Sequence, residues 1–142
     1  MSISCGTDII EIERIRHSIE KLGEKFLNEI YTDKEIQYCE SRKKQKYQHY
    51  AARFAAKEAI FKAISRNLKD KYEVGWKDIE VLNDEQSRPY VKIKGERKNN
   101  IDISISHCKE YAVATVVMVA TKIWNKVLES EEIWIYLIAM HI

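Results

Sequence analysis

The sequence lacks several features that mark specialised classes of protein. Only three cysteines occur among its 142 residues, none in a metal-type pair, and an odd number leaves at least one thiol unpaired. This composition favours a reducing compartment. The N-terminus shows no basic segment followed by a long apolar run, so we predict no secretory signal and expect a cytoplasmic protein.

A strong charge of one sign and a long apolar run are also missing. Lysine and arginine number 24 against 22 acidic residues, so the net charge of +2 gives no general case for nucleic acid. The basic residues 42–46 have no aromatic platform and indicate a solvated turn, although a small RNA-binding protein would use such a run. The apolar residues 133–142 give about half the length of a membrane-spanning helix, so we expect no span.

The order of the expected elements predicts the fold class. The length and the hydrophobic content of 45% suit one domain. A short strand over 3–10 precedes helices that extend to about residue 65, and Thr32 and Glu35 form the capping-box pattern of a helix beginning near Asp33. Later strands are expected at 78–82, 90–94, 101–106 and 111–120. Helices early and antiparallel strands late predict an α+β fold, with one long central helix packed on a small sheet.

The long helix, expected over 47–66, places charge beside its apolar stripe. Glu58 falls within about 40° of Phe54 on a helical wheel, and Lys62 lies one turn further on. A half-buried carboxylate needs a partner or a metal ion. The pair is either an ordinary i,i+4 ion pair or part of a functional site.

Two further residues leave the same choice open. Asp8 is either the N-cap of a helix beginning at residue 9 or a functional carboxylate. His107 follows the alternating strand 101–106 and is either a capping or core histidine or a site residue. Cys108 does not form a catalytic dyad with it, because neighbours on a strand point to opposite faces.

Three groups of residues, in this order, resemble the holo-acyl-carrier-protein synthase family, which comprises the short, single-domain 4′-phosphopantetheinyl transferases. The resemblance includes Trp76-Lys77-Asp78-Ile79-Glu80-Val81 and covers about residues 3–119. The groups are Gly6-Thr7-Asp8 with Arg14, Arg53-Phe54-Ala55-Ala56-Lys57-Glu58-Ala59 with Lys62-Ala63, and Ser104-Ile105-Ser106-His107 with Tyr111-Ala112-Val113-Ala114. The resemblance implies transfer of phosphopantetheine from coenzyme A to a serine of apo acyl carrier protein. It also implies the 4′-phosphopantetheinyl transferase fold in a homotrimer, with active sites between neighbouring subunits.

The resemblance also implies roles for individual residues. Asp8 and Glu58 would hold Mg²⁺ against the pyrophosphate of coenzyme A, and two carboxylates suit that ion. Glu58 and Lys62 are the expected catalytic residues, with the general base left open, and Arg14 would face an acidic helix of the carrier protein. The expected coenzyme A contacts are Arg53, Lys57, Lys62, Ser106 and His107. For Arg53 and Lys57, a solvated helix face is the alternative.

The sequence departs from the family in one turn. Ser65-Arg66-Asn67 replaces a usual Gly-Thr-Gly, and backbone approaches a phosphate most easily at glycine. A noncatalytic carrier-protein or nucleotide-binding module on the same scaffold is therefore the alternative function. We expect a transferase domain over residues 1–122 and a C-terminal extension of unknown role over 123–142.

Overall fold

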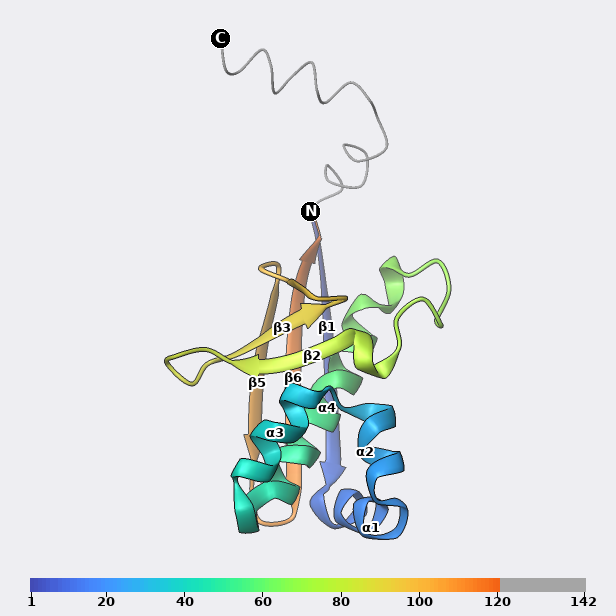
Figure 1. Cartoon of the computed structure of the whole chain (residues 1–142). Helices are drawn as coiled ribbons and strands as arrows, with labels where there is room; N and C mark the ends of the chain where they lie inside the picture. The colour runs from blue at the N-terminus through green and yellow to red at the C-terminus, as the bar shows by residue number, and fades with distance from the viewer. Residues whose placement is uncertain (121–142) are drawn as a thin grey trace.

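A computed structural model describes residues 1–120 (Figure 1), so the expected extension at 123–142 and its apolar run lie outside the described residues. Helices dominate the first half and strands the second, which confirms the predicted α+β class. The elements are β1 (Ser2–Glu11), α1 (Ile12–Leu22), α2 (Glu24–Ile30), α3 (Asp33–Ser41), η1 (Lys43–Gln45), α4 (Lys46–Ile64), η2 (Ser65–Asn67), η3 (Trp76–Asp78), β2 (Ile79–Asn83), β3 (Pro89–Ile93), β4 (Glu96–Arg97), β5 (Ile101–His107) and β6 (Tyr111–Ala120).

Two small antiparallel sheets make up the β part of the molecule. The first has the order β1-β6-β5, with the two ten-residue strands β1 and β6 paired along their whole length. Strands β1 and β5 are therefore its two edges. The second sheet has the order β2-β3-β4, in which β2–β3 is the predicted hairpin and β4 is a short addition that the sequence pattern did not indicate. In Figure 1 this hairpin crosses the upright strands of the first sheet, and α1 to α3 lie toward one end.

Helix α4 covers one face of the first sheet and packs mainly on β1 and β6. Its buried positions are mostly alanines, whose small side chains allow the helix to lie close to β1. The approach is very close at Gly6, where an added Cβ would lie 1.9 Å from the carbonyl oxygen of Ala59. One turn away, the Ser4 hydroxyl donates to the carbonyl of Ala63 at 2.8 Å. This face of β1, which also carries Asp8, is fixed against the helix.

The other face of the first sheet carries exposed apolar side chains among polar ones and is not covered by any of residues 1–120. We call it the outer face; it includes Ile3, Ile9, Val117 and Val119, which are 64%, 60%, 41% and 36% exposed. Strand register places these side chains in cross-strand pairs, such as Ile3 opposite Val119. The strand over Tyr111 to Ala120 was predicted to face the interior or another subunit. Its residues alternate between the outer face and the face that is buried under α4.

The predicted helix starts agree with the structure. Thr32 caps α3 with a full capping box, in which its backbone N–H donates to Glu35 Oε1 at 2.9 Å. The long helix predicted over 47–66 is α4 followed by η2. The basic turn is η1 with the start of α4, and most of its side chains are exposed. Among residues 1–120, no helix has the length and apolar content to cross a bilayer.

Candidate active site

Strand β1 and helix α4 bring Asp8 and Lys62 into contact. Alternation along β1 puts Asp8 on the face that meets α4, together with Ser4 and Gly6. The Lys62 ammonium donates to Asp8 Oδ1 at 3.1 Å and to the Thr7 carbonyl at 2.7 Å. Asp8 lies inside β1, and α1 begins only at Ile12, so the N-cap alternative for Asp8 is wrong.

Glu58 adds a second carboxylate one turn earlier on α4. Its side chain is partly buried, and burial is the main cause that raises its pKa above the usual value. The Asp8 charge raises that pKa further, and the Lys62 ammonium partly offsets both effects. The three charges therefore act on one another. The ion-pair partner of Lys62 is Asp8, so the ordinary helix pair of Glu58 with Lys62 is not what forms.

The donor set of this group fits a magnesium ion that is shared with a substrate. Within residues 1–120, Asp8 and Glu58 are not joined by a third His, Cys, Asp or Glu side chain that would complete a protein cage. Magnesium is commonly held by one or two carboxylates, with substrate phosphates and water as its other ligands. Two carboxylates beside an ammonium are suited to a phosphorylated ligand.

A hollow of about 330 Å³ opens beside Glu58. Its wall is formed by Phe61 of α4 and by the segment that leads into η3, including Val74, Gly75 and Trp76. The Trp76 ring stacks on Phe54 at 5.0 Å and meets Phe61 edge-on at 5.4 Å. Trp76 was not among the predicted site residues, although the family resemblance includes the segment that it begins.

A second group of residues lies at the β5 edge of the sheet. Ser106 and His107 end β5 and are exposed, and the His107 ring lies 5.8 Å from that of His49 on α4. His107 is therefore neither a core residue nor a helix cap. Burial lowers the pKa of His49 to about 4, helped by the positive charges of Arg53 and Arg42 and by His107. His49 and Arg42 belong to this group but were not predicted.

Arg53 is part of the same group and is almost fully buried, at 3% exposed. Its guanidinium lies 3.9 Å from the ring centre of Tyr38 and donates from Nη2 to Asn83 Oδ1 at 3.1 Å. The Nε of Arg53 is buried and has no hydrogen-bond acceptor within residues 1–120. The solvated-face alternative for Arg53 is wrong, because the side chain is buried.

Lys57 occupies a different place from the one predicted. It is 0% exposed, and its ammonium donates to Glu35 Oε1 at 2.6 Å and to the carbonyls of Ile30 and Trp76 at 2.7 and 3.0 Å. An ammonium has three protons, so all of its donors are used. We therefore withdraw Lys57 from the coenzyme A contacts, and the solvated-face alternative is wrong as well.

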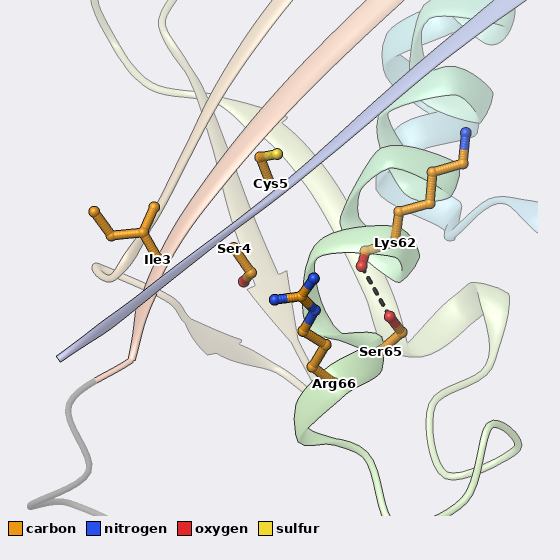
Figure 2. A pocket seen from close by; sticks show the side chains of 6 residues that line it. All are labelled: Ile3, Ser4, Cys5, Lys62, Ser65 and Arg66. Atoms are coloured by element: carbon orange, nitrogen blue, oxygen red, sulfur yellow. Dashed lines mark hydrogen bonds between the residues drawn. The ribbon is translucent and has the colours of Figure 1, made fainter.

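One predicted residue, Arg14, lies outside both groups, and the departure from the family turn lies beside Lys62 of the first group. Arg14 is exposed on α1 in a hollow that it shares with Glu13 and His17 and with no other predicted site residue. The departure from the family turn lies in a pocket of about 400 Å³, whose lining side chains are drawn in Figure 2. There Ser65 donates to the Lys62 carbonyl at 2.9 Å, and Arg66 lines the wall next to β1, so a cation stands where the family has a glycine-rich turn.

The sequence-family model of the 4′-phosphopantetheinyl transferase superfamily matches residues 4–116 of this chain. That range includes every predicted site residue. This chain belongs to that superfamily. The family recognised from the sequence is therefore confirmed.

Individual relatives agree with this membership. The holo-[acyl-carrier-protein] synthase of Thermodesulfovibrio yellowstonii is 50% identical over 80% of this chain and 95% of its own length. That of Ruminiclostridium cellulolyticum is 45% identical over 83% of this chain and 92% of its own. A crystal structure of the Bacillus anthracis synthase, in complex with CoA (3′,5′-ADP), superposes with a TM-score of 0.67 at 37% identity, covering 83% of this chain and 96% of that one.

Proposed function

We propose that this protein transfers the 4′-phosphopantetheine group of coenzyme A to a serine hydroxyl of apo acyl carrier protein. The products are holo acyl carrier protein and adenosine 3′,5′-bisphosphate. The observation that carries this proposal is the meeting of Asp8, Glu58 and Lys62 at one place, between β1 and α4. The relatives named above are holo-[acyl-carrier-protein] synthases, and one of them has bound coenzyme A.

The chemistry assigns a task to each of these three residues. The serine oxygen forms a bond to the phosphorus that carries pantetheine, and the bond from that phosphorus to the bisphosphate leaving group breaks. The Lys62 ammonium offsets the negative charge on the phosphate oxygens. Asp8 and Glu58 would hold Mg²⁺, which when bound supplies a Lewis acid for the pyrophosphate. The proton of the serine goes to Glu58 or to a water molecule that Glu58 holds.

The cationic group at the β5 edge is suited to the other phosphates of coenzyme A. Arg53 offers a buried donor that lacks an acceptor within the described chain, and His107 is exposed next to Ser106. An arginine held over the Tyr38 ring and hydrogen-bonded to Asn83 is pre-ordered for binding a phosphate. We assign Arg53, Ser106 and His107 to coenzyme A on this basis, and Arg14 to the carrier protein on the basis of the family resemblance.

The two groups lie toward opposite edges of the β1-β6-β5 sheet, which supports an active site shared between subunits. A second copy bound at the outer face would bring its β5 edge to the β1 edge of the first. The large exposed apolar side chains of that face favour such burial. We propose a homotrimer, in which the same contact repeated three times closes a ring.

The first experiment is the intact mass of an apo acyl carrier protein after incubation with this protein, coenzyme A and magnesium. We expect a gain of one phosphopantetheine that disappears with a chelator and in Asp8→Ala or Glu58→Ala. Glu20→Gln, which changes an exposed carboxylate on α1, is the matched control and keeps full activity. Full turnover in either alanine variant would contradict the metal assignment. Coenzyme A binding without any mass gain would instead favour the noncatalytic module.

The assembly is tested by light scattering on a sizing column. The wild type should elute as a trimer, and Val117→Glu should dissociate and lose transfer, because a charge would have to be buried at the outer face. Leu22→Glu changes an apolar residue of similar exposure on α1 and should leave the trimer intact. A fully active monomeric wild type would refute the shared site.

The proposed location remains the cytoplasm. Cys5, Cys39 and Cys108 are all free thiols, and two of them are exposed. This is consistent with the reducing compartment expected from their odd number.

A further inference from the structure

The buried ion pair between Glu35 and Lys57 is a costly feature to which the proposed reaction assigns no task. Both side chains are 0% exposed, and their charged atoms lie 2.6 Å apart. Removing two charges from water costs free energy that an apolar pair of similar size would not. The pair is therefore weak evidence for stability, and a role in fixing the position of something else is the alternative.

The groups that surround the pair belong to separate parts of the chain. Glu35 accepts backbone N–H groups of Thr32 and of Val81 in β2, at 2.9 and 3.0 Å. Lys57 donates to the carbonyls of Ile30, which ends α2, and of Trp76, which begins η3. The pair thus fastens α4 to four segments, and one of them carries Trp76.

That segment forms the wall of the hollow beside Glu58. Val74, Gly75 and Trp76 line the hollow opposite α4, and the Trp76 ring rests on two aromatic side chains of the same helix. Lys57 and Glu58 are neighbours that point about 100° apart around α4. Lys57 therefore donates a hydrogen bond to the main chain of the wall from inside the molecule, while Glu58 faces the hollow that the wall encloses.

We propose that Lys57, held by Glu35, is a positioning residue for the transfer reaction: its bond to the Trp76 carbonyl fixes the wall that faces Glu58. This inference depends on the proposed function, because it concerns how the substrate is held beside that carboxylate. Lys57 touches neither substrate nor metal. It acts through Trp76.

The test is a double-mutant cycle on kcat. Glu35→Gln with Lys57→Met replaces the ion pair by neutral side chains of similar size and avoids leaving one buried charge alone. We expect kcat of this variant to fall at least tenfold, with the KM for coenzyme A within about twofold of wild type. Trp76→Leu should lower kcat by a similar factor. Adding it to the first variant should lower kcat little further, since both changes act on the same wall.

A second readout does not depend on activity. Lys69 and Lys71 are exposed in the segment before Trp76 and are sites for trypsin. In the double variant, trypsin should cut at these lysines at least fivefold faster than in the wild type, while the rate of cleavage at Lys21 in α1 stays the same. The matched control is Ile60→Val, which leaves a small cavity beside a buried position of the same helix. It should lower the melting temperature without changing kcat or the cleavage pattern.

The outcomes separate this inference from the proposed function. A wild type without transfer activity refutes the proposed function. If the wild type is active, two results overturn the positioning role. In the first, the effects of the ion-pair replacement and of Trp76→Leu on kcat multiply when the changes are combined. In the second, trypsin cleaves the ion-pair variant faster at every site. If the double variant does not fold, Trp76→Leu, which alters the same wall and leaves the ion pair in place, takes its place in both measurements. Unchanged kcat in folded Trp76→Leu also overturns the role.

Discussion

His49 should make the stability of this protein depend on pH in a range where most side chains do not titrate. The folded protein favours the neutral imidazole, because burial and the positive charges of Arg53 and Arg42 lower the pKa of His49 from 6.5 to about 4. His107 and the Tyr38 ring face it as well. In the unfolded chain the imidazole has its ordinary pKa. Above pH 6.5 the imidazole is mostly neutral in both states and costs no stability. As the pH falls from 6.5 toward 4, the unfolded chain binds a proton that the folded protein does not, so the free energy of unfolding falls.

The size of the effect follows from that difference in pKa. Linkage gives roughly 2 kcal/mol of lost stability at pH 5 for a group with these two pKa values. His49 is only partly buried, and solvent screens the charges around it. We halve the figure for this reason and expect about 1 kcal/mol.

The assay is urea unfolding of the wild type and of His49→Gln at pH 7.5 and at pH 5, at one protein concentration. Carboxylates that titrate in both proteins cancel in the difference. Glutamine stays neutral, so the variant should gain about 1 kcal/mol relative to wild type between the two pH values. Adenosine 3′,5′-bisphosphate should reduce this gain, because an anion near Arg53 favours the charged imidazole. Parallel pH dependence of the two proteins would refute the reasoning.

Three further changes have expected outcomes. Gly6→Ala forces a methyl group to within 1.9 Å of the Ala59 carbonyl and should destabilise by about 3 kcal/mol in urea unfolding, whereas Gly95→Ala, with open space around its Cβ, should cost about 1 kcal/mol for its positive φ. Thr32→Ala removes the cap of α3 and should lower stability by about 1–2 kcal/mol, which Thr32→Ser should largely restore. Lys62→Ala should lower kcat about 100-fold in initial-rate assays while the magnesium concentration at half-maximal rate changes little.

Much of the fold was predictable because it follows from local patterns. The alternation of 101–106 predicts β5, and the capping box at Thr32 fixes the start of α3. The order of strands in the sheet was not predictable in the same way. It depends on contacts between β1 and β6, which are about a hundred residues apart in the sequence. Such long-range pairing leaves no short-range signal.

The site shows the same division between local and long-range information. Glu58 and Lys62 are one turn apart on α4, so the sequence alone places them together. Their meeting with Asp8 needed the family resemblance, because it depends on the close approach that Gly6 permits. His49 was missed since its partner His107 lies on a distant strand, and a lone histidine inside a helix carries no signal of its own.

Lys57 shows why position in a motif does not assign a role. Between Arg53 and Glu58 the chain places several charges on one helix, and a helical wheel cannot say which of them receives a buried partner. Glu35 lies in another helix, 22 positions earlier, and its carboxylate forms an ion pair with the Lys57 ammonium at 2.6 Å. Together with the hydrogen bonds to the carbonyls of Ile30 and Trp76, this bond leaves Lys57 without a donor for a phosphate. The motif therefore contains residues in two different settings: Glu58 faces a hollow, and we propose that it acts on the substrate, whereas Lys57 is buried, and we propose that it holds the wall that Glu58 faces.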